Sequence, residues 1–207
     1  LNPGDPLPSE RELMKFFGVS RSSLREALKI LDTIGFVEIS QRKRTRVKSL
    51  VPGSFIEPIR RLLKEDINTV LEVHDVRMCL ESWNAYYAAQ RSTKDDIKRL
   101  GLNIESMEKV ITKKKSLIED DAAFHLLISG ATHNKIQTHL MFSIYALIQS
   151  TVGICYETSE SIEILEEHKE IYRAIKDKNP ALAREKMNIH LDNVLSRIHK
   201  FFEKKSK

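Results

Sequence analysis

The sequence predicts a mainly α-helical protein: an N-terminal winged helix-turn-helix with a small β-hairpin wing, followed by an all-α antiparallel bundle of six to seven helices. Two short helical patterns joined by a Gly-Val turn predict the helix-turn-helix. An alternating strand pair with a basic tip predicts the wing, and unbroken helical periodicity beyond residue 60 predicts the bundle. The 207 residues are 41% hydrophobic, which is enough for a packed core and excludes a wholly disordered chain.

Sequence signals mark where the two N-terminal helices begin and end. Ser9 and Glu12 form a capping-box pair, which predicts that the first helix begins after Ser9 and ends at Gly18. Ser20 is placed to cap a second helix over residues 21–33. Hydroxyl and guanidinium groups gather at the start of this second helix, and both types of group are suited to binding DNA.

The wing is predicted from residues 36–39 and 45–47, with residues 41–44 as its basic tip. Such a tip would lie along a DNA backbone or enter the minor groove. Residues 1–50 contain ten basic and six acidic side chains, a net charge of +4, which favours a polyanionic partner. If charge were the only observation, an ordinary solvated surface would be the favoured interpretation.

A Val-Pro-Gly sequence at residues 51–53 is the best boundary signal. We therefore predict a DNA-binding domain over residues 1–50, a linker over 51–66 and a helical domain over 67–203.

Helical periodicity predicts each element of the second domain, and no strand pattern competes with it. The expected helices, after a short connector helix over 54–64, cover residues 67–91, 94–113, 117–131, 135–157, 161–177 and 180–203.

Three of the seven histidines lie on apolar faces of three different predicted helices: His125, His168 and His190. Asp121 precedes His125 by one helical turn, so both project from one face. Three interior histidines and one carboxylate are the donor set of a Zn, Ni, Mn or Fe site with open positions. The alternative is that each is a hydrogen-bonded core residue.

The front of the chain also resembles a known family. Residues 7–13, 18–28 and 31–37 resemble the DNA-binding domain of the GntR superfamily, in the FadR-type branch. This resemblance implies that the chain binds double-stranded operator DNA and acts as a homodimer, because one domain reads only a half-site. Two departures stand out: Arg42 occupies the wing tip, where the family usually has glycine, and the chain begins too late to include the helix that usually precedes residue 3.

The resemblance also assigns the DNA contacts. Arginines are expected on bases or adjacent phosphates and serines on phosphates, and the basic tip is expected on the backbone. The candidate residues are Arg11, Ser20, Arg21, Ser22, Arg25, Gln41, Arg42, Lys43 and Arg44. The alternative for each arginine is an ion pair on the helix surface.

Residues 67–200 resemble the FCD effector-binding domain of FadR-type regulators. In its metal-containing members, one Asp and three His at positions like Asp121, His125, His168 and His190 hold a divalent ion. The remaining four histidines match no ligand position, and we expect them at the surface or at helix ends. They are His74, His133, His139 and His199.

Arg77 has two interpretations. It lies four residues before Glu81, which fits a helical ion pair. It could instead bind the carboxylate of an effector, as the family resemblance implies. A metal with open positions beside an arginine would suit a small organic acid.

These observations predict a cytoplasmic, DNA-binding transcriptional regulator, associated with the bacterial nucleoid when bound, whose operator affinity a small carboxylate effector controls at a metal site. A regulator with a purely structural metal is one alternative, and a metal-dependent hydrolase is another. The sequence lacks HExxH, GxSxG and a phosphate-binding glycine loop, and Glu166 and Glu167 are expected to point away from His168, so we expect no enzyme. No apolar run is long enough to cross a membrane. Two cysteines, Cys79 and Cys155, are expected to be reduced and buried.

Overall fold

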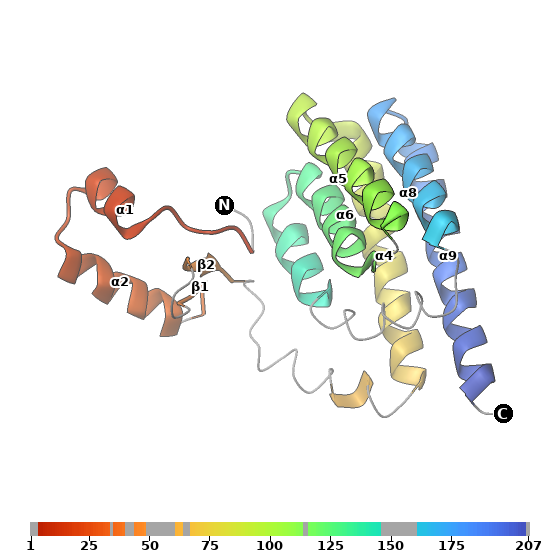
Figure 1. The fold of residues 1–207 in the computed structure, drawn as a ribbon, viewed down its shortest axis with the longest axis horizontal. Coiled ribbons are helices and arrows are strands. Elements are labelled where there is room, and N and C mark those ends of the chain that lie inside the picture. The colour runs from red at the N-terminus through yellow and green to blue at the C-terminus, as the bar shows by residue number, and fades with distance from the viewer. Residues whose placement is uncertain are drawn as a thin grey trace.

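The computed structural model describes residues 4–33, 35–39, 44–48, 61–63, 67–113, 116–145 and 161–205. It is mainly helical, with two short front helices and a small wing at one end and a helical bundle at the other (Figure 1). The predicted fold class is confirmed. Gln41, Arg42, Lys43 and Cys155 lie outside the described residues.

Helices α1 (Glu10–Phe17) and α2 (Arg21–Thr33) form the helix-turn-helix. The predicted capping box is present: the amide of Ser9 donates to Glu12 Oε2 at 2.8 Å, and the amide of Glu12 donates to Ser9 Oγ. Gly18 ends α1 at φ +66°, a left-handed conformation that glycine adopts without a Cβ penalty. Ser20 accepts a hydrogen bond from the amide of Ser23 at 3.2 Å, which caps α2 as predicted.

The wing consists of β1 (Val37–Glu38) and β2 (Arg46–Val47), paired antiparallel in the register Val37 to Val47. The segment before α1 runs beside β2. The amide of Gly4 donates to the Val47 carbonyl at 2.8 Å, and Pro6 forms an isolated bridge with Arg46. These backbone bonds fix the start of the helix-turn-helix against the wing.

The body contains five labelled helices and a further helical stretch over residues 135–145. Their bounds are α4 Ile67–Arg91, α5 Lys94–Thr112, α6 Ile118–Ala131, α8 Ser161–Lys176 and α9 Pro180–Lys205. The predicted spans are confirmed within two residues at every described end. Only residues 61–63 of the predicted connector helix are described, and they are helical.

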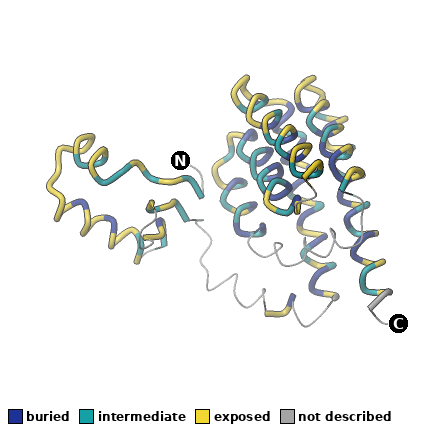
Figure 2. Tube along the Cα trace, viewed as in Figure 1, coloured by how far each residue is buried: buried dark blue, intermediate teal, exposed yellow. Residues whose placement is uncertain are grey.

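Helix α4 packs against three other helices of the bundle, α6, α8 and α9. Helix α4 packs along α9, α8 packs against α9 and α5, and α6 contacts both α4 and α5. Figure 2 shows the buried residues on the faces that these helices turn toward one another. The main apolar cluster includes Leu100, Met107, Phe124, Ile171 and Leu191, all fully buried. By contrast, only Leu24 and Leu28 are buried in α2, and no residue of α1 is.

Two predictions about single residues are wrong. Cys79 is exposed, because it lies on the outer face of α4. His74 is buried, because it lies on the inner face of the same helix. Within the described part of the chain, no helix has the length and apolar content needed to span a bilayer.

The capping box of α5 gives a test of the fold. The amide of Thr93 donates to Asp96 Oδ2 at 2.8 Å, and Thr93 Oγ1 accepts from the amide of Asp96. We predict that Thr93→Ala lowers the free energy of unfolding by about 1 kcal/mol, measured by urea denaturation. The control is Thr112→Ala, near the other end of α5, where the hydroxyl bonds only within the helix. Equal effects of the two substitutions would contradict the capping role.

Candidate metal centre and DNA-binding surface

Four buried donors from three helices meet at the centre of the bundle. Asp121 and His125 come from α6, His168 from α8 and His190 from α9, and one donor atom from each lies within 4.8 Å of the others. Because metal–donor bonds measure about 2.0–2.2 Å, small side-chain shifts would place all four donors around one divalent ion. The predicted residues are therefore together in space.

One ring nitrogen of each histidine in this cluster faces the other donors without a hydrogen bond. Nε2 of His125, His168 and His190 is fully buried and has no hydrogen-bond partner among the described residues. Burial, followed by repulsion from neighbouring histidines, holds the pKa of His168 well below its usual range. Burial also lowers the pKa of His190, although its hydrogen bond to Glu167 opposes the shift. Neutral rings with unshared lone pairs fit a metal ion, and without one these nitrogens would be costly to bury.

Glu81 lies on the far side of His125 from the donor cluster. Its Oε2 is 2.5 Å from His125 Nδ1, and its Oε1 accepts a hydrogen bond from Arg77 Nε at 2.6 Å. Burial alone would raise the Glu81 pKa, but Arg77 and His125 hold it well below its usual range. An ionised carboxylate on Nδ1 leaves Nε2 of His125 free to face the metal.

Glu167 makes the corresponding contact with Nδ1 of His190. Its Oε2 lies 2.7 Å from His190 Nδ1, and its Oε1 accepts hydrogen bonds from Arg197 and Asn193 at 2.6 and 2.8 Å. Burial alone would raise the Glu167 pKa, but the bonds to His190 and Arg197 lower it to about 2. As expected, Glu167 points away from His168, but it contacts another histidine of the cluster, His190. The residue turns toward α9 rather than toward His168, its neighbour in sequence.

Arg77 is buried beside the site. Its guanidinium carbon lies 5.9 Å from the ring centre of Tyr145, and that ring lies 5.5 Å from the ring of His125. The predicted pair with Glu81 is present in the described structure. Sequence reasoning missed Tyr145, since a single buried tyrosine carries no pattern that distinguishes it from a core residue.

On the DNA-binding side, Arg21 and Arg25 both contact Glu10. The distances from Nε to the carboxylate are 3.3 Å for Arg21 and 3.2 Å for Arg25. Both arginines remain exposed, and the two contacts, each through Nε, align their side chains along one face of the helix-turn-helix. The alternative prediction, an ion pair on the surface, therefore applies to these two arginines in the free protein.

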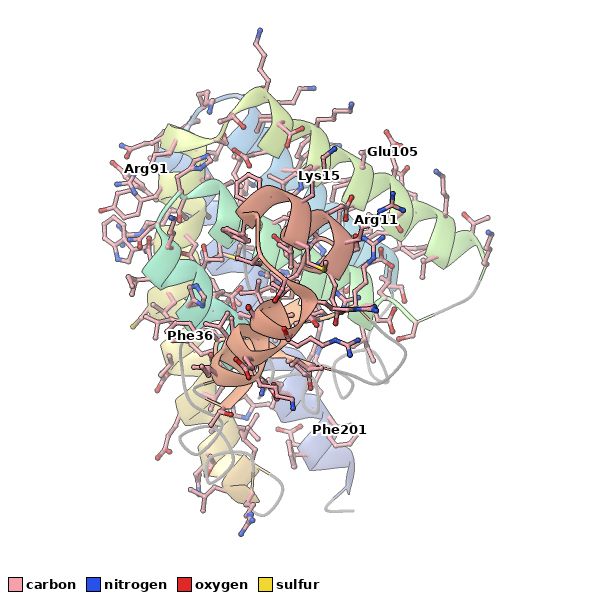
Figure 3. The ribbon with its side chains drawn as sticks, turned by 90° about the vertical axis from the view of Figure 1, so that its left-hand side faces the viewer. Arg11, Lys15, Phe36, Arg91, Glu105 and Phe201 are labelled. Carbon is pink, nitrogen blue, oxygen red and sulfur yellow. The ribbon has the colours of Figure 1, made fainter. Side chains whose placement is uncertain are left out.

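The other predicted DNA contacts are also exposed. Arg11 lies on α1 and makes no ion pair with the described residues, and Figure 3 looks onto this end of the molecule with Arg11 and Lys15 labelled. Ser20 and Ser22 bond to each other through their hydroxyls at 2.9 Å at the start of α2. Arg44 is exposed at the wing. A helix N-terminus with two hydroxyls and nearby arginines can hold phosphates.

Comparison with known proteins gives two family matches. Residues 1–47 match the gntR family of bacterial regulatory proteins, and residues 72–193 match the FCD domain. The chain is 32% identical to the HTH-type transcriptional regulator LutR of Bacillus subtilis, over 98% of this chain and 95% of that protein. It is also 32% identical to the Glc operon transcriptional activator of Escherichia coli K12, over 96% and 82%.

A solved structure shares the fold. Streptococcus agalactiae GntR superposes with a TM-score of 0.58 at 24% identity, covering 93% of this chain and 89% of that one.

The neighbouring residues Glu166 and Glu167 give a test of the buried network. Glu166 is exposed and bonds to Lys169, whereas Glu167 is mostly buried and bonds to Arg197 and His190. In metal-free protein, we predict that Glu167→Gln lowers the free energy of unfolding by about 2 kcal/mol or more, because it removes the mostly buried carboxylate that pairs with Arg197 and leaves that arginine the longer contact to the exposed Glu163. Glu166→Gln should change it by less than about 0.5 kcal/mol.

The effect of Glu167 should also depend on pH. A carboxyl with a depressed pKa adds stability above its ordinary pKa of about 4.3 and loses this contribution as the pH falls through the folded value. The difference between wild type and Glu167→Gln should be complete above about pH 5 and shrink toward pH 2. Urea denaturation across this range measures it, and a difference that grows on acidification would contradict the network.

Proposed function

This chain belongs to the gntR family of bacterial regulatory proteins, carries an FCD domain and is a DNA-binding transcriptional regulator rather than an enzyme; from that premise we propose that a small organic acid, bound at a divalent metal ion in the helical body, controls its affinity for operator DNA. The metal would be held by Asp121, His125, His168 and His190. The regulator would act in the cytoplasm.

The observation that carries the proposal is the set of three buried, unpartnered Nε2 atoms around Asp121. Carboxylates behind two of the rings, on Nδ1 of His125 and His190, support it, since metal-binding histidines usually have such partners. Three imidazoles and a carboxylate suit Zn, Ni, Mn or Fe. When bound, such an ion would offer open positions to the oxygens of an acid.

We assign Arg77 to the carboxylate of that acid. Its Nε is used by Glu81, and a guanidinium carries further N–H donors in a planar fork that fits a carboxylate. Because Glu81 also contacts His125, the acid and the metal would share one rigid network.

The DNA-binding half would work as a homodimer on a near-palindromic operator, because one helix-turn-helix reads only a half-site. Arg11, Arg21 and Arg25 are assigned to bases or adjacent phosphates, and Ser20 and Ser22 to phosphates. The wing tip, with Gln41, Arg42, Lys43 and Arg44, is assigned to the backbone. Effector binding would shift the bundle and, through residues 51–66, the spacing of the two recognition helices. The expected coupling free energy is about 1–3 kcal/mol.

One observation favours a second candidate. Arg77 is already paired with Glu81 at 2.6 Å in the described structure. The metal would then be purely structural, and the regulator would sense no small molecule. This candidate predicts the same metal content but no effect of acids on DNA binding.

The metal assignment gives one prediction. His168→Ala should abolish stoichiometric metal binding, because it removes a ligand that is fully buried at the centre of the cluster. The measurement is metal content by inductively coupled plasma mass spectrometry, with native mass spectrometry for the mass of the assembly. The matched control is His133→Ala on the exposed side of the bundle. Full metal content in the His168 variant would remove this residue from the ligand set.

The assignment of the DNA contacts gives a second prediction. Arg21→Ala should weaken binding to a site selected by the wild type from random duplexes by about tenfold or more, while metal content stays unchanged. The exposed Lys98 on α5 supplies a control that removes one positive charge away from the helix-turn-helix. Fluorescence anisotropy measures both variants, and an equal loss for Lys98→Ala would indicate a general charge effect instead of a DNA contact.

A further inference from the structure

His74 is an interior histidine that lies outside the candidate metal cluster. Its side chain is 3% exposed, and neither ring nitrogen has a hydrogen-bond partner among the described residues. Arg77 and Glu81, which are also buried on α4, bond to each other instead. Because burying an imidazole without partners is unfavourable, a ligand that hydrogen-bonds to His74 would remove this cost.

The position of His74 relates it to the metal cluster. It lies on the same buried face of α4 as Arg77 and Glu81, three and seven residues earlier in the helix. These separations correspond to about 4.5 Å and about 10 Å along the axis. Glu81 contacts His125 of the candidate metal cluster, so Arg77 lies along α4 between His74 and the residue that contacts the cluster.

Burial disfavours the charged form of His74. Burial lowers its pKa, and the positive charge of Arg77 lowers it further, while Glu81, Asp75 and Asp192 act in the opposite direction. Apolar side chains, including Val70 and Val194, form a cluster beside it between α4 and α9. A neutral imidazole offers one N–H donor and one acceptor. It can therefore bind a hydroxyl through both functions or donate to a carboxylate.

We propose that His74 is a specificity-determining residue that hydrogen-bonds the end of the acid effector remote from the metal. This inference rests on the proposed sensor function and deepens it. Along α4, Arg77 lies between His74 and Glu81, the residue that contacts the cluster, so an acid held at the metal must extend past Arg77 to reach His74. A four- to six-carbon acid with a second carboxylate or distal hydroxyls offers polar groups beyond the end that the metal and Arg77 would hold. Two-carbon and three-carbon hydroxy acids have no such distal group.

The test uses metal-loaded protein and five acids as probes. Glycolate and L-lactate represent short acids, and L-malate, citrate and D-gluconate represent long ones. Isothermal titration calorimetry measures the affinity of each acid for wild type, for His74→Leu and for the control His199→Leu, whose histidine is exposed on α9. Metal content and the melting temperature without acid are measured for every variant.

We expect wild type to bind at least one long acid more tightly than either short acid. His74→Leu should weaken that binding about tenfold, the loss expected for one hydrogen bond to a buried group, and leave binding of short acids unchanged. Its metal content should stay full, and its melting temperature should be equal or higher, since leucine removes an unsatisfied buried polar group. The His199 control should behave as wild type.

Three results would overturn the inference. If long acids bind wild type and His74→Leu equally, His74 is satisfied by water and the sensor function itself survives. A preference of wild type for glycolate or L-lactate would contradict the predicted length of the effector. If none of the five acids binds metal-loaded wild type, both this inference and the proposed sensor function fail.

Discussion

The need to compensate charged and polar groups buried inside the helical bundle determines much of this structure. Arg77, Glu81, His168 and His190 are almost fully withdrawn from water. Each unpaired charge in such a place would cost several kcal/mol. Two short networks of hydrogen bonds and ion pairs compensate these buried groups. One joins Arg77 through Glu81 to His125, and the other joins Arg197 through Glu167 to His190.

These two networks also explain how four helices cooperate at one point. Glu81 connects α4 to α6, and Glu167 connects α8 to α9. Both carboxylates lie on the Nδ1 side of a histidine, which leaves Nε2 of each ring for the centre of the cluster. A metal ion there would lock all four helices together. A ligand on that ion would thus act on the whole body rather than on one helix, as a transmitted conformational signal requires.

The sequence predicted the elements well because their signals are local. Capping boxes at Ser9 and Thr93 and the left-handed position of Gly18 define helix ends through neighbours in the chain. The clustering of Asp121, His125, His168 and His190 was also predictable, since each histidine lies on an apolar helix face. The residues that contact those histidines could not be predicted from the sequence. Glu167 and His190 meet across two helices, and no spacing within either helix encodes that contact. His74 was misjudged for the same reason, because the helix that covers its face is distant in sequence.

The most direct test of the account is the affinity of metal-loaded protein for its selected operator, measured with and without a saturating acid that calorimetry has shown to bind. The account predicts a change of about 5- to 150-fold, which corresponds to a coupling of about 1–3 kcal/mol, and the loss of that change when the metal is removed. An operator affinity that stays the same with and without the bound acid would contradict it and leave a DNA-binding regulator with a structural metal.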